Sequence, residues 1–79
     1  IIGLQETHWK DEFIDMYKHL WNGDIIYNNY DSSARGVAFL IRNDLKENVD
    51  FVNGFDGRFL HIKYKDNDET FDIINVYAP

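Results

Sequence analysis

Glu6 is the residue of this sequence best placed for metal chemistry. It follows the apolar run Ile1 to Leu4, which predicts a buried strand, and α/β proteins commonly place ligands just past the ends of such strands. Mg²⁺ prefers oxygen ligands and is typically held by one or two protein carboxylates together with substrate phosphates. One carboxylate is therefore the start of a metal site and not a complete one. By position alone, a solvated glutamate at a strand end is the simpler explanation.

Four further residues could act on or near a phosphate. His8 could carry a proton near neutral pH or contact a phosphate. Arg35 and Arg58 each adjoin a glycine at the entrance to a predicted strand, from which a guanidinium can bind a phosphate through two hydrogen bonds. Tyr77, near the end of the last predicted strand, could direct its hydroxyl toward a site or simply pack. Each of the four also has a plain structural explanation as a surface or packing residue.

Composition and missing motifs exclude several classes of protein. The 79 residues contain no cysteine, no Gly-rich phosphate loop and no nucleophile-elbow serine, which removes thiol, P-loop and serine-hydrolase chemistry. The lack of cysteine weakly favours an intracellular protein, and we expect no membrane association because no apolar run approaches the roughly 20 residues that span a bilayer. The formal charge of −6 opposes DNA binding by the isolated chain, since such binding depends on Lys and Arg displacing counterions from phosphates.

The hydrophobic pattern predicts the elements that position these residues. Helical spacing of apolar residues over about 10–21 predicts one helix, which Asn22-Gly23 is expected to end with a left-handed glycine. The continuous apolar run at 36–41 is typical of a central strand. The other predicted strands are 1–4, 24–30, 48–53, 58–65 and 70–77, with turns at 31–33, 54–57 and 66–68.

This order predicts an α/β or α+β fold in which one strand and one helix precede a sheet of mostly antiparallel strands, with the helix on one face. The second face also needs cover, and the sequence offers no second helix. We therefore expect that layer to come from residues outside the 79 or from a partner. The chain opens on Ile1-Ile2 without a Met and closes on Tyr77-Ala78-Pro79, so we interpret 1–79 as a partial domain truncated at both ends.

Four ordered blocks of the sequence resemble one enzyme superfamily. They are Leu4-Gln5-Glu6-Thr7-His8, Arg35-Gly36-Val37-Ala38-Phe39-Leu40-Ile41, Gly57-Arg58-Phe59-Leu60 and Ile74-Asn75-Val76-Tyr77-Ala78-Pro79. In order and spacing they are similar to the endonuclease/exonuclease/phosphatase superfamily, which includes deoxyribonuclease I and apurinic endonucleases. The Thr-His-Trp continuation of the first block and the Val-Tyr-Ala-Pro ending look most like the endonuclease domains of non-LTR retrotransposon reverse transcriptases.

The resemblance implies the N-terminal part of a four-layered α/β sandwich, deoxyribonuclease I-like, with two sheets between helices. It also implies hydrolysis of a DNA phosphodiester with Mg²⁺ or Mn²⁺. Glu6 would match the metal-ligand glutamate of the superfamily, and Tyr77 its active-site tyrosine, which contacts the phosphate region. His8, Arg35 and Arg58 would lie near the nucleic-acid face. The parent protein would bind DNA and act in the nucleus.

The sequence departs from the superfamily pattern in three places. The first-strand Asn, the later Asp-x-Asn pair and the terminal Ser-Asp-His block are absent, so nothing activates water or stabilises the leaving oxygen. We therefore predict that the 79 residues alone are inactive. Two alternatives stay open: a phosphatase, sphingomyelinase or deadenylase of the same superfamily, or a non-catalytic module that presents a sheet edge or the Trp9 and Trp21 face. Reading the parent gene past Pro79 separates them.

Overall fold

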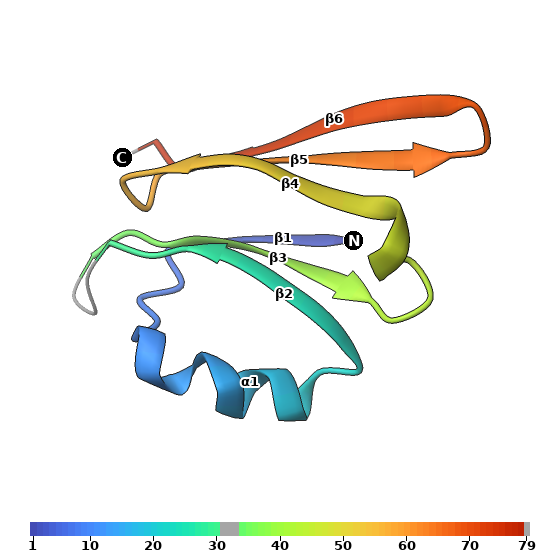
Figure 1. Ribbon diagram of the computed structural model, residues 1–79. Coiled ribbons are helices and arrows are strands. Elements are labelled where there is room, and N and C mark those ends of the chain that lie inside the picture. The colour runs from blue at the N-terminus through green and yellow to red at the C-terminus, as the bar shows by residue number, and fades with distance from the viewer. Residues whose placement is uncertain (31–33, 79) are drawn as a thin grey trace.

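The computed structural model describes residues 1–30 and 34–78, which form one α-helix and six β-strands (Figure 1). The strands are β1 (Ile2–Gln5), β2 (Gly23–Asn28), β3 (Val37–Arg42), β4 (Val49–Phe55), β5 (Phe59–Asp66) and β6 (Glu69–Val76). The helix α1 spans Ile14–Leu20, with single 3-10 turns at Asp11–Phe13 and Lys46–Asn48. Every predicted strand is confirmed with shifted ends, and the predicted helix is confirmed as a 3-10 turn followed by α1. The predicted turn at 31–33 and Pro79 lie outside the described residues.

The six strands form two antiparallel sheets, ordered β1-β3-β2 and β4-β5-β6. The α+β class is therefore confirmed, and α/β is wrong because no described strand pairs in parallel. The hydrophobic pattern predicted a single sheet, whereas the chain leaves the first sheet after β3 and builds a second one. Figure 1 shows the two sheets facing each other, with α1 on the outer side of the first sheet. Two sheets are what the family resemblance implied.

The core lies between the two central strands. Val37, Phe39 and Ile41 of β3 and Leu60 and Ile62 of β5 are all buried and form one apolar cluster. Residues two apart in a strand share a face, so each strand contributes one face to this cluster. The alternate residue Ala38 is also fully buried and lies on the opposite face of β3 by the same alternation. The helix α1 lies on that outer side of the first sheet (Figure 1). Cover on both faces explains the continuous apolar run, and the prediction of a central strand at 36–41 is confirmed.

Two details of the first sheet correct the sequence analysis. The strand β1 is not buried, as the 49% exposure of Ile2 shows. The reason is that β1 is an edge strand, paired only with β3. Gly23 does not end the helix in the left-handed conformation and instead begins β2. A glycine is required there for a different reason: a Cβ would lie 1.9 Å from the carbonyl oxygen of Ile41.

The outer face of the second sheet carries exposed apolar side chains. Phe55 is 70% exposed, Ile74 53% and Val76 51%, and Phe59 pairs with both Phe55 and Val76 at this end of the sheet. No described helix covers this face. That residues outside the 79 or a partner cover this face therefore stays a prediction. None of the described helices is long and apolar enough to cross a membrane.

Candidate functional site

The segments that follow β1 and β6, precede β3 and join β4 to β5 meet at one end of the two sheets, on the side where Figure 1 marks the C-terminus. Backbone hydrogen bonds connect them. The amide of Thr7 donates to the carbonyl of Gly36 (3.2 Å), and the amide of Gly36 donates to the carbonyl of Gly57 (2.8 Å). The amide of Tyr77 donates to the carbonyl of Arg58 (2.8 Å). The four segments therefore form one connected surface, and they carry every candidate residue predicted from the sequence.

Glu6 and Tyr77 are in direct contact on this surface. The hydroxyl of Tyr77 donates a hydrogen bond of 2.9 Å to Oε1 of Glu6. This bond is the main cause of a raised pKa for Tyr77, because ionising the phenol would remove the donor; desolvation and the negative charge of Glu6 add to it. Arg58 and Arg35 act in the opposite direction on the same pKa. The positive charges of the two arginines favour the ionised phenol and so oppose the rise in pKa.

The backbone at this end is held in an uncommon conformation. Glu6 (φ 51°), His8 (φ 53°), Arg35 (φ 63°) and Asp56 (φ 60°) all adopt the left-handed region, which non-glycine residues seldom occupy. The fifth such residue among those described, Asn67, lies in the β5–β6 turn at the opposite end. Strained backbone of this kind persists where surrounding contacts enforce it, and it clusters at functional sites.

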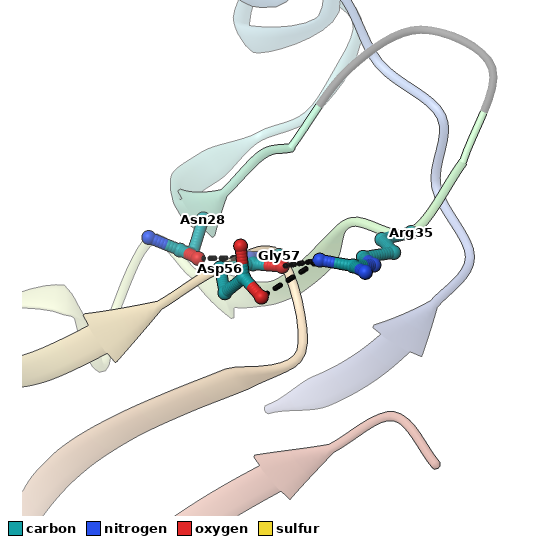
Figure 2. A network of polar contacts seen from close by, with 4 residues as sticks. All are labelled: Asn28, Arg35, Asp56 and Gly57. Atoms are coloured by element: carbon teal, nitrogen blue, oxygen red, sulfur yellow. Dashed lines mark hydrogen bonds and ion pairs between the residues drawn. The ribbon is translucent and has the colours of Figure 1, made fainter. Parts of the chain in front are cut away.

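Arg35 is engaged in holding the β4–β5 turn, as Figure 2 shows. Its Nη1 lies 2.7 Å from Oδ2 of Asp56, and its guanidinium stacks 4.0 Å above the ring of Tyr30. From the other side, Oδ1 of Asn28 accepts a hydrogen bond of 2.6 Å from the amide of Gly57. A guanidinium committed to an ion pair and a ring is poorly placed to bind a phosphate as well. Its predicted nucleic-acid contact remains untested, while its structural role is plain.

Arg58 and His8 are more accessible. The side chain of Arg58 is exposed and forms no ion pair with any described residue. His8 is also exposed; its backbone amide donates to the carbonyl of Arg35 (3.1 Å), which keeps the residue beside the site. Of the two arginines predicted from the sequence, Arg58 is therefore the more available to an incoming anion.

A buried polar link next to Glu6 and Tyr77 was missed by the sequence analysis. Asn75 is 7% exposed, and its Nδ2 donates to the carbonyls of Leu4 (2.9 Å) and Ala38 (3.0 Å). Its Oδ1 accepts a hydrogen bond of 3.2 Å from Nε2 of Gln5. The signal was present in the sequence, because Asn75 occupies an inward position of β6, two residues before Tyr77, where an apolar side chain is expected.

Glu6 is the only carboxylate that the prediction assigned to a metal, and the structure does not add a set of partners to it. No group of three or more His, Cys, Asp or Glu side chains among the described residues is arranged to hold a metal ion. An ion held wholly by protein side chains, such as a structural zinc, therefore does not fit the described site. An exposed carboxylate at a strand end fits Mg²⁺, which keeps several waters and takes further ligands from phosphates.

Comparison with known proteins finds similarity to a protein of a transposon. No protein-family model and no solved structure matches the sequence. Over 77 residues the chain is 30% identical to the "Transposon TX1 uncharacterized 149 kDa protein" of Xenopus laevis. It is a partial homologue of a transposon protein. The match covers 96% of this chain but 6% of the transposon protein, so the chain spans a small part of that relative.

Proposed function

We propose that the chain is part of a metal-dependent phosphodiester hydrolase, the DNA-nicking endonuclease of a non-LTR retrotransposon. The observation that carries the proposal is the 2.9 Å hydrogen bond between Tyr77 and Glu6. Two residues from opposite ends of the chain, each chosen from the sequence for phosphate or metal chemistry, meet at one point of the surface. The similarity to a transposon protein supports the retrotransposon part of the proposal.

In this function Glu6 holds the metal ion and Tyr77 orients the phosphate. Bound Mg²⁺ or Mn²⁺ would polarise a phosphate oxygen and lower the pKa of a bound water. A tyrosine phenol is protonated at neutral pH, and the raised pKa of Tyr77 only extends this, so the hydroxyl can donate a hydrogen bond to Glu6 or to a phosphate oxygen. Arg58 supplies an exposed positive charge at the same place. His8 would contact nucleic acid at the edge of this surface, and Arg35 would hold the β4–β5 turn beside it through Asp56 and Tyr30.

Only part of the negative charge that gives the chain a net charge of −6 lies far from the candidate site. The acidic residues Asp66, Asp68 and Glu69 flank the β5–β6 turn, which lies at the end opposite the candidate site (Figure 1). Arg58 lies at the site end. Carboxylates also lie at the site end, namely Glu6 itself, Asp56 beside Arg35, and Asp11, which is hydrogen-bonded to Asn29 just past β2. A bound metal ion would therefore have to offset negative charge at the site, while the acidic β5–β6 turn is screened because exposed charges interact weakly beyond about 10 Å.

The proposal includes a longer parent protein. The later Asp-x-Asn pair and Ser-Asp-His block of the superfamily are not in these residues, so we expect the 79-residue chain to bind metal weakly and cleave nothing. The remainder of the same domain would cover the exposed side chains of Phe55, Ile74 and Val76 and complete the four-layered sandwich. The parent would bind DNA in the nucleus.

A non-catalytic interaction module is the second candidate, and the exposed outer face of the second sheet favours it. The two tryptophans, Trp9 and Trp21, do not favour this candidate. The ring of Trp9 lies 5.1 Å from that of Tyr17, and Nε1 of Trp21 donates to the carbonyl of Ile41 (3.0 Å), so both pack within the chain. A non-catalytic interaction module would use the exposed outer face of the second sheet and would not need Glu6 as a metal ligand.

Titration of the chain with Mn²⁺, followed by nuclear magnetic resonance, tests the metal site. The paramagnetic ion should broaden the signals of Glu6 and Tyr77 first, and Glu6→Gln should abolish this selective broadening. Glu47→Gln is the matched control, because Glu47 is an equally exposed glutamate in the 3-10 turn before β4. Broadening centred elsewhere, or unchanged in Glu6→Gln, would disprove the metal role.

Nicking of supercoiled plasmid with Mg²⁺ by the longer gene product tests the activity. Cleavage by the native protein and its loss in Glu6→Ala would establish the endonuclease activity and its dependence on Glu6. A folded product that binds Mn²⁺ at Glu6 without cleaving DNA would instead favour a phosphatase relative.

A further inference from the structure

Asn75 connects the two sheets through three hydrogen bonds of its carboxamide. Its Nδ2 donates to the carbonyls of Leu4 and Ala38, which are directly paired residues of β1 and β3. Its Oδ1 accepts from Gln5. Burial of an amide is unfavourable unless its hydrogen bonds are made, so these partners specify one position of β6 over the first sheet. An apolar side chain at the same place would pack without specifying that position.

Gln5 extends this connection toward the proposed site. Its Nε2 donates to Oδ1 of Asn75 (3.2 Å) and to the carbonyl of Val76 (2.5 Å), the two residues that precede Tyr77 in the chain. Gln5 itself immediately precedes Glu6. The end of β1 is thus joined to the end of β6 by two side-chain hydrogen bonds, one part-buried and one exposed, next to the Glu6–Tyr77 contact.

The Glu6–Tyr77 hydrogen bond does not hold the two segments together unaided. Its oxygen atoms are within reach of water, and although the ring of Tyr77 packs against the core, the exposed side chain of Glu6 can turn to solvent instead, so the bond by itself contributes little. The bonds of Asn75 are part-buried or buried, so water competes with them poorly. Burial therefore decreases from the carboxamide of Asn75, through the half-buried Tyr77, to the exposed Glu6.

We propose that Gln5 and Asn75 are positioning residues that hold the carboxylate of Glu6 beside the hydroxyl of Tyr77. They touch neither metal nor phosphate and act through the backbone of the two strand ends. Their effect on metal affinity rests on the proposed function, whereas their effect on the Glu6–Tyr77 geometry does not. Supporting residues behind metal ligands typically change metal affinity about 10- to 100-fold when replaced.

Gln5→Ala and Asn75→Ser in the 79-residue chain test this role, with Ile73→Val as the matched control. Ile73 lies on the same strand and the same inward face as Asn75, so its truncation lowers stability without removing a polar contact. The first measurement is the nuclear Overhauser effect between the Tyr77 ring and the side chain of Glu6. We expect a clear signal in the native chain and in Ile73→Val, and its loss in the other two variants.

The second measurement is the Mn²⁺ dissociation constant at Glu6. We expect an increase of about 10-fold in Gln5→Ala and Asn75→Ser and little change in Ile73→Val. Should Asn75→Ser fail to fold, Gln5→Ala decides, because Gln5 is exposed and its truncation leaves the core intact. An undiminished Overhauser signal in folded Gln5→Ala, or no signal in the native chain, would overturn the positioning role. Failure of the native chain to bind Mn²⁺ would contradict only the proposed function, since the Overhauser measurement needs no metal.

Discussion

The hydroxyl of Tyr77 lies 2.9 Å from Oε1 of Glu6, although 71 positions separate the two residues in the chain. They meet because β1 and β6 are edge strands of different sheets that lie next to each other. Glu6 follows the end of β1 and Tyr77 follows the end of β6 at the same end of the molecule. The contact thus depends on how the two sheets stack and not on either strand alone.

Glu6→Gln should lower the pKa of Tyr77 toward the ordinary tyrosine value of about 10. The largest cause of the raised pKa is the hydrogen bond to Glu6, and the substitution also removes the negative charge that opposes ionisation of the phenol. A ¹³C titration of the Tyr77 ring measures the shift. Glu47→Gln should leave the titration unchanged; an equal shift in both variants would contradict a direct contact.

Tyr77 should make stability depend on pH in the alkaline range. Its pKa is raised in the folded chain, so its stabilising contribution is fully present below the unfolded pKa of about 10 and is lost as the pH rises through the folded pKa. Tyr77→Phe removes this contribution. Urea unfolding at pH 8 and at higher pH should therefore show a steeper alkaline loss of stability in the native chain than in Tyr77→Phe. Parallel curves would refute the linkage.

Arg35→Lys should destabilise the chain by about 1 to 2 kcal/mol, because lysine cannot reproduce both the ion pair with Asp56 and the stacking on Tyr30. Arg42→Lys is the matched control: Arg42 pairs with Asp44, but both side chains are largely exposed, at 66% and 63%. We expect a smaller loss there. Urea unfolding followed by tryptophan fluorescence measures both, and equal losses would show that Arg35 does not hold the β4–β5 turn.

Gly57→Ala should destabilise the chain by about 1 to 3 kcal/mol. Gly57 has φ 66°, and a Cβ would lie 2.7 Å from Cβ of Tyr30. The same substitution at Gly54 should lower stability less. Gly54 has no left-handed φ, and its added Cβ would meet the side chain of Asn28 at 3.0 Å. Thermal unfolding of the two variants gives the comparison. A larger loss at Gly54 would contradict the described turn geometry.

Leu60→Ala should lower the free energy of unfolding by about 2 to 5 kcal/mol, since Leu60 is fully buried between the central strands. A small domain has little stability to spare, so the variant is expected to be largely unfolded. Circular dichroism against temperature measures this. Val52→Ala, at a side chain that is 42% exposed, should have a much smaller effect.

The sequence by itself determined the elements and their order. Period-two alternation, the single helical stretch and the apolar run at 36–41 are local features of the chain, and the structure confirms the strands and the helix that they predict. The five candidate residues were also visible locally, as a carboxylate, a histidine, a tyrosine and two arginines at strand ends or beside glycines. Hydrophobic periodicity carries this information because it reports which face of each element is buried.

Only the tertiary structure decided which elements pack together and which side chains meet. The pattern could not show that β3 and β4 belong to different sheets, that β1 is an exposed edge, or that Arg35 is bound to Asp56. It also gave no role to Asn75, whose partners Leu4 and Ala38 lie 71 and 37 positions away. Contacts over such separations depend on sheet stacking, which periodicity within one strand does not encode, and so the juxtaposition of Glu6 with Tyr77 appears only once the two sheets are assembled.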